Sequence, residues 1–133
     1  MIICFYHKQR RCGAECRLAA RQERMSITSD LIRGHTETII LAKLMEKDSY
    51  GYEINKAIYQ ASSQRYELKE ATLYTAFKRL EDMGYISSYW GDQSTGARRK
   101  YYTITGIGKE TYRQKIEEWL EAKQLLDALL KTD

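Results

Sequence analysis

The stretch KEATLYTAFKRLEDMGYISSYW, residues 69–90, decides the fold because it joins two different residue patterns. In its first part, four apolar residues recur at the spacing that places side chains on one face of a helix. These are Leu73, Ala76, Phe77 and Leu80. Gly84 follows where a helix end favours a left-handed residue, and residues 85–90 are then rich in aromatic and β-branched side chains. The stretch predicts a helix over residues 69–83 that leads directly into a β-strand.

Two further helical patterns precede this stretch. The first runs from Ser29 to about Lys47, with Ser29 or Asp30 as its cap. Its apolar residues are Leu31, Ile32, Ile39, Ile40, Leu41, Leu44 and Met45. A short turn at residues 48–51 then leads to a second apolar face. That face consists of Ile54, Ala57, Ile58 and Ala61.

A second strand and a long final helix follow. Residues 100–105 have the same strand composition as residues 85–90, and small polar residues lie between the two, so a hairpin with a long tip is predicted. Beyond Gly106 and Gly108, apolar residues alternate in steps of four and three, which is a heptad pattern. Its positions are Tyr112, Ile116, Trp119, Lys123, Leu126 and Leu130. We expect this seam to pack against a partner helix.

The order of these elements predicts a mainly α fold with a small β part (α+β). Three helices followed by a hairpin describe a winged helix-turn-helix, here with a long C-terminal dimerisation helix. A length of 133 residues suits a single core. We expect a basic tail over residues 1–24, a DNA-binding domain over residues 25–105 and the dimerisation helix over residues 106–133.

The first 24 residues differ from the rest in charge and cysteine content. They carry six basic and two acidic residues, which accounts for the whole net charge of +4, since the remainder holds sixteen of each. Cys4, His7, Cys12 and Cys16 offer four zinc ligands, but their spacing fits no common zinc module. The alternative is a disordered basic tail ahead of a functional start at Met25. No export signal or membrane span is evident, so we expect a soluble, cytoplasmic protein without cofactors.

The helix over residues 69–83 has a polar side opposite its apolar face. The candidates there for contacts to phosphates and base edges are Lys69, Thr72, Tyr74, Thr75, Lys78 and Arg79. An ordinary solvated face is the alternative reading. The composition of the hairpin favours binding to double-stranded DNA over an ordinary solvated face. Residues 93–103 include three consecutive basic residues and no acid. The hairpin's candidates are Arg98, Arg99, Lys100 and Tyr101.

Trp119 has two interpretations. An aromatic residue at helical spacing is usually part of a core. On a seam at a two-fold axis, however, two indole rings would face each other and could stack on a planar ligand. Lys123, on the same seam, needs solvent or a nearby acid, with Glu37, Glu118 and Glu121 as candidates.

The sequence contains no motif that indicates an enzyme active site. Gly106-Ile107-Gly108-Lys109 lacks the other residues of a phosphate loop, and His7 and His35 have no nucleophile and acid arranged around them. A non-enzymatic protein is therefore expected. The alternative to a DNA-binding regulator is a winged-helix adaptor that uses its hairpin on an acidic protein partner.

Several motifs together resemble the PadR family of transcriptional regulators, in the branch with a single C-terminal helix. They are Leu31-Ile32-Arg33-Gly34, Tyr50-Gly51-Tyr52-Glu53-Ile54, Glu70-Ala71-Thr72-Leu73-Tyr74, Lys78-Arg79-Leu80-Glu81 and Gly96-Ala97-Arg98-Arg99-Lys100-Tyr101-Tyr102. The third helix, the hairpin and Glu117-Glu118-Trp119 are also similar to lactococcal multidrug-binding repressors. The resemblance implies a homodimeric repressor of transporter or stress genes that binds an inverted-repeat operator.

The resemblance also implies a site for an aromatic small-molecule effector at the dimer axis. Trp119 would stack on the effector, and the lining residues would be Leu31, Gly34, Glu37, Ile116 and Lys123. Lys123 stands where the lactococcal pattern has an acid, which disfavours cationic compounds by charge repulsion.

Overall fold

A computed structural model describes residues 30–91 and 98–131, in two units that divide between His35 and Thr36. In the first unit residues 30–33 are helical and Gly34 and His35 form a turn, closed by a 2.8 Å hydrogen bond from the His35 amide to the Ile32 carbonyl. The prediction of one helix from Ser29 to Lys47 is therefore wrong at this turn. Glycine inside a helix costs about 1 kcal/mol relative to alanine, which favours a break here.

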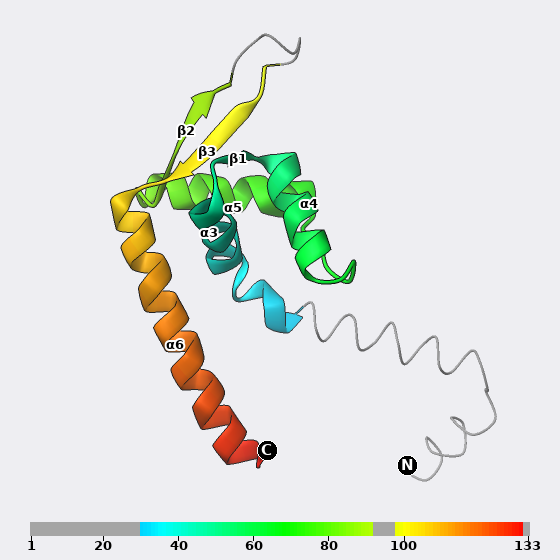
Figure 1. The fold of residues 1–133 in the computed structure, drawn as a ribbon, viewed down its shortest axis with the longest axis vertical. Coiled ribbons are helices and arrows are strands. Elements are labelled where there is room, and N and C mark those ends of the chain that lie inside the picture. Colours follow the sequence, from blue (N-terminus) through cyan, green and yellow to red (C-terminus); the bar gives the residue numbers. More distant parts are fainter. Residues whose placement is uncertain (1–29, 92–97, 132–133) are drawn as a thin grey trace, which may run out of the picture. The chain divides into compact units, whose positions relative to one another are not determined.

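The second unit begins with α3 (Thr36–Glu46), β1 (Ser49–Tyr50) and α4 (Gly51–Ala61). Figure 1 shows these elements next to α5 (Glu70–Asp82), which lies where the apolar spacing predicts a helix. All four predicted apolar residues of α5 are buried, and Gly84 has the expected positive φ of 78°. The face predicted for α4 is buried at Ile54 and Ile58, while Ala61 at its end is exposed.

A three-stranded antiparallel sheet completes the winged helix-turn-helix. Strands β2 (Ile86–Trp90) and β3 (Lys100–Ile104) form the predicted hairpin, and β1 adds to the other side of β3. The residues expected to form only a turn thus contain a strand. One face of the sheet covers the core, where Tyr102 is buried and stacks on Phe77 with ring centroids 4.0 Å apart. The predicted fold class, helical with a small sheet and a long final helix, is confirmed.

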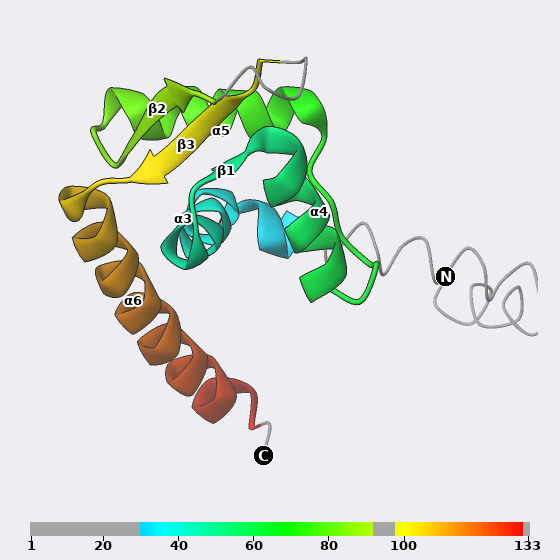
Figure 2. The ribbon, with the colours of Figure 1, turned by 45° about the horizontal axis from the view of Figure 1, so that its top comes forward.

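Helix α6 (Gly106–Leu130) leaves the end of β3 and packs along α3 (Figure 2). Thr105 caps it by accepting a 3.1 Å hydrogen bond from the Gly108 amide. Tyr112 packs against the core, but farther along the helix large apolar side chains are exposed. They are Trp119, Leu120, Leu125, Leu126, Leu129 and Leu130. Among the described residues, no helix is long and apolar enough to cross a membrane.

Candidate nucleic-acid interface

The solvent side of α5 presents most of the polar residues proposed from sequence. Lys69, Thr72, Thr75 and Lys78 are exposed, although the Thr75 hydroxyl also donates a 2.7 Å hydrogen bond to the Ala71 carbonyl within the helix. Because the opposite face is fixed in the core, this side keeps a defined orientation. It can offer hydroxyl and ammonium groups to a nucleic-acid groove.

The start of α5 is held from α4 by Asn55. Its side-chain carbonyl accepts a 2.8 Å hydrogen bond from the Leu68 amide, and its NH2 group donates a 2.8 Å bond to the Leu68 carbonyl. Lys69, the first residue before the helix, provides no side-chain cap of its own. Sequence reasoning missed Asn55, because a bond across thirteen residues leaves no local pattern.

Two of the α5 candidates already contact other parts of the fold. Tyr74 is half exposed and meets Phe77 edge to face, with ring centroids 5.8 Å apart. Arg79 forms an ion pair with Glu37 of α3, with Nε and Oε1 3.3 Å apart. Contact of Arg79 with a phosphate would therefore compete with Glu37.

The three consecutive basic residues of the hairpin point to both sides of the sheet. Arg98 lies over Trp90, and Arg99 lies over Tyr50 with its guanidinium carbon 4.7 Å from the ring centroid. Lys100 lies 3.9 Å from the carboxylate of Glu81 on α5. Residues 93–103 contain no acid, but Lys100 receives a counter-charge from another element of the fold. The predicted tip residues 92–97, with Gly96 and Ala97, lie outside the described residues.

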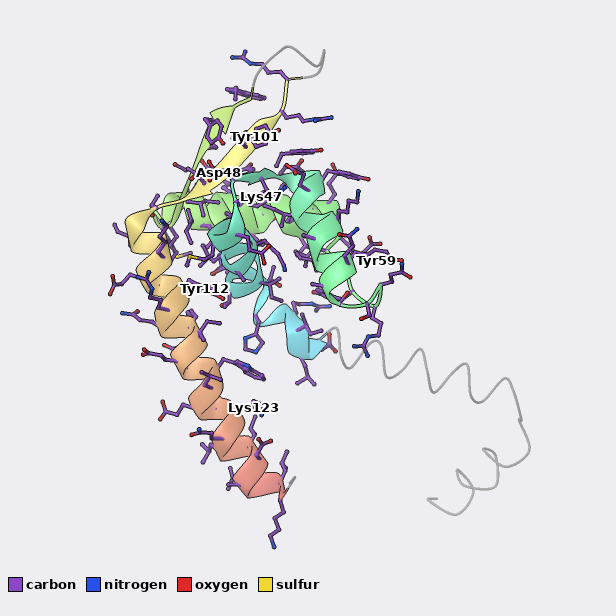
Figure 3. The ribbon with its side chains drawn as sticks, in the orientation of Figure 1. Lys47, Asp48, Tyr59, Tyr101, Tyr112 and Lys123 are labelled. Carbon is purple, nitrogen blue, oxygen red and sulfur yellow. The ribbon has the colours of Figure 1, made fainter. Side chains whose placement is uncertain are left out.

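A row of tyrosines crosses the outer face of the sheet. Tyr50, Tyr101 and Tyr89 are partners in register on β1, β3 and β2. The Tyr101 ring meets Tyr50 edge to face at 5.5 Å and stacks on Tyr89 at 5.7 Å. Tyr101 was a candidate from sequence, whereas Tyr50 was missed because β1 was not predicted. Figure 3 shows Asp48 and Tyr101 at this sheet.

Tyr89 also donates a 2.8 Å hydrogen bond to the carboxylate of Asp48. This bond raises the pKa of the Tyr89 hydroxyl above its ordinary value, because it stabilises the protonated form. The stabilisation is present below the pKa of tyrosine in the unfolded chain and is lost as pH rises through the higher pKa of the folded state.

The variant Asp48→Asn should therefore lower the pKa of Tyr89, since a neutral amide replaces the carboxylate. NMR of the tyrosine ring carbons during an alkaline titration measures this directly. Asp82→Asn, which removes an acid from α5 instead, is the control and should leave the Tyr89 titration where it is. Identical Tyr89 titrations in the wild type and Asp48→Asn would refute the role of the bond.

The residues proposed to line an effector site come from the first unit, from α3 and from α6. Lys123 pairs with Asp127 at 3.4 Å, Glu118 pairs with Lys115, and Glu37 pairs with Arg79. Within the chain the acid beside Lys123 is thus Asp127, one helical turn onward at a normal pairing distance, and not one of the candidates Glu37, Glu118 and Glu121. Ile116 is half buried and Trp119 is 44% exposed on α6. Leu31 and Gly34 belong to the other unit.

The residues considered as zinc ligands from the sequence lie outside the part of the chain that the structure describes. Within residues 30–91 and 98–131, no group of His, Cys, Asp and Glu side chains could hold an ion. Cys4, His7, Cys12, Cys16 and the start at Met25 lie outside the described residues, as does the basic tail over residues 1–24.

Comparison with known proteins decides the family. The model of the transcriptional regulator PadR-like family matches residues 40–114, from α3 through the hairpin into α6. This chain belongs to the PadR-like family of transcriptional regulators. PadR-like regulators bind DNA, and membership confirms the expectation of a non-enzymatic regulator.

Two relatives of this PadR-like chain differ in how much of their length it spans. An uncharacterized protein of Lysinibacillus sphaericus is 45% identical over 105 residues, which are 79% of this chain and 96% of the relative. The negative transcriptional regulator PadR of Bacillus subtilis is 29% identical over 94 residues, which are 71% of this chain and 50% of that protein.

Solved structures of similar regulators share the fold. A transcriptional regulator from Clostridium thermocellum is 51% identical, with a TM-score of 0.70 over 75% of this chain and 94% of that chain. A PadR family regulator from Clostridium difficile is 39% identical, with a TM-score of 0.65 over 72% of this chain and 98% of that chain. One from Eggerthella lenta is 28% identical, with a TM-score of 0.75 over 87% of this chain and 99% of that chain.

Proposed function

We propose that this PadR-like chain is a homodimeric repressor that reads an inverted-repeat operator in the cytoplasm. The observation that supports it best is the exposed polar side of α5 beside a hairpin that carries Arg98 and Arg99. In this proposal α5 is the recognition helix in the major groove, and the wing, meaning β2, β3, Arg98 and Arg99, contacts flanking phosphates. The DNA-contacting residues would be Lys69, Thr72, Tyr74, Thr75, Lys78, Arg79, Arg98, Arg99, Lys100 and Tyr101.

The dimer would be formed through α6. Its exposed apolar side chains support this, because a helix that leaves Trp119 and Leu126 about half exposed can bury them against a second copy. Two copies would then place their recognition helices about 34 Å apart, on successive major grooves. In this division residues 25–105 bind DNA, residues 106–133 form the dimer, and residues 1–24 are a basic tail.

We further propose that an aromatic compound between the two Trp119 side chains releases the repressor, as in lactococcal multidrug-binding repressors. A ligand at this place would bias the angle of α6 and so the spacing of the recognition helices. It would lower operator affinity only as far as it prefers the released arrangement. The regulated genes would be those of transporters or stress responses.

The double variant Arg98→Ala/Arg99→Ala tests the role of the wing. It should weaken binding to every duplex, by about tenfold near 0.1 M salt, and flatten the salt dependence by about two units of slope, because two phosphate contacts are lost. Gel shifts over a range of salt concentrations measure both effects.

A matched control is Lys109→Ala/Arg113→Ala, which removes two positive charges from exposed positions of α6. It should change the salt dependence far less, because the charges lie outside the proposed interface. If the wing variant binds DNA like the wild type, the wing has no part in the interface.

A further inference from the structure

The carboxylate of Glu81 joins the recognition helix to both strands of the wing. One of its oxygens, Oε2, accepts a 3.2 Å hydrogen bond from the Ser88 hydroxyl on β2. The other, Oε1, lies 3.9 Å from the ammonium group of Lys100 at the start of β3. A single side chain on α5 therefore contacts both arms of the hairpin.

These contacts have a small effect on stability. Lys100 is 43% exposed and Glu81 31%, and ion pairs at such positions are screened by water. An acid beside the proposed DNA contacts also repels phosphates. The consequence of Glu81 is therefore expected in DNA binding, where it changes both the charge and the position of the wing.

We propose that Glu81 is a specificity-determining residue, which holds the wing in register with the recognition helix and masks Lys100 from non-specific DNA. Phosphate contacts fix the position of a protein on the duplex, while the recognition helix reads the bases. If the wing moves relative to α5, its phosphate contacts still form. They no longer hold the recognition helix at one position along the base sequence. An unmasked Lys100 then strengthens binding to non-specific sequences, on which the wild-type Lys100 stays paired with Glu81. This inference rests on the proposed DNA-binding function.

The test compares Glu81→Gln with Asp82→Asn. Both remove one negative charge from the end of α5, but Asp82 is an exposed neighbour and Glu81 contacts the wing. The probes are a random-sequence duplex and a duplex selected from a random pool with the wild-type protein. Affinity for each is measured from low to high salt.

Glu81→Gln should bind the random duplex about fivefold more tightly near 0.1 M salt, because Lys100 is then free to contact a phosphate. The slope of the logarithm of its association constant against the logarithm of salt concentration should be steeper by about one. Its preference for the selected duplex should fall about tenfold. Asp82→Asn should strengthen binding to both duplexes alike and keep the preference. Thermal midpoints should stay within about 2 °C of the wild type in both variants.

Two further variants separate the two contacts of Glu81. Ser88→Ala removes the hydrogen bond and leaves the ion pair, so it should lower the preference without changing the salt slope. In a Lys100→Gln background, adding Glu81→Gln should no longer steepen the slope, because the unmasked cation is absent.

The outcomes distinguish this inference from the function on which it rests. If the wild type binds no duplex in a salt-dependent way, the proposed DNA-binding function fails. If the wild type binds but Glu81→Gln keeps its preference for the selected duplex, or matches Asp82→Asn throughout, Glu81 has no special role and the inference alone is overturned.

Discussion

Replacing Gly108 by alanine is expected to destabilise the fold by about 3 kcal/mol, although the change adds a single methyl group. Gly108 is buried in the first turn of α6, where a Cβ atom would overlap the backbone carbonyl oxygen of Tyr85 and come within 2.8 Å of Ile104. Backbone cannot move aside as a flexible side chain can. The carbonyl of Tyr85 also accepts a 3.0 Å hydrogen bond from the Thr105 amide, so a shift would disturb the junction between sheet and α6.

Gly106→Ala is the matched control. It lies two residues earlier in the same helix, but nothing lies within 4 Å of the added Cβ. Its stability should stay within about 0.5 kcal/mol of the wild type. Urea unfolding followed by circular dichroism gives both values, and the thermal midpoint of Gly108→Ala should fall on the order of 15 °C. A Gly108→Ala protein as stable as Gly106→Ala would show that α6 starts differently.

The second large effect concerns the proposed dimer. Leu126→Glu should raise the dimer dissociation constant at least about a hundredfold, because an unpaired carboxylate would be buried in the apolar interface. Leu126 is 49% exposed in the single chain, so the fold of each monomer should survive. Operator affinity should fall as well, since two half-sites are then no longer bound by one linked pair of recognition helices.

Gln124→Glu adds the same charge at an exposed position on the other side of α6 and should leave the dimer intact. Sedimentation of both variants at micromolar concentration measures the assembly, and circular dichroism checks that helix content is preserved. A Leu126→Glu protein that sediments as the wild type does would place the interface elsewhere.

Local periodicity predicted most of the fold. The buried positions of α5 and the two strands of the hairpin follow from residue spacing alone, because each pattern spans several residues of one element. Strand β1 could not be predicted in this way. It has two residues, and Ser49 pairs with Tyr102 more than fifty positions later in the sequence. The break at Gly34 was hidden by apolar residues that continue the helical spacing on either side.

The residues of the candidate site were predictable from the sequence, but most of the ion pairs that they form were not. Exposed Lys78 and the two arginines of the wing follow from charge and composition. The acids that pair with Lys100 and Arg79 come from other elements, so nothing near either residue indicated them. Asp127 is different, because it stands four residues after Lys123 on one helix and its pairing was available from spacing.

The salt dependence of wild-type binding to duplex DNA tests the central claim most directly. If α5 and the wing contact phosphates as proposed, the logarithm of the association constant falls steeply and linearly with the logarithm of salt concentration, even on a random duplex. Several phosphate contacts predict a slope of about −4 or steeper. A slope near zero would contradict the account and favour an adaptor that uses its hairpin on a protein partner.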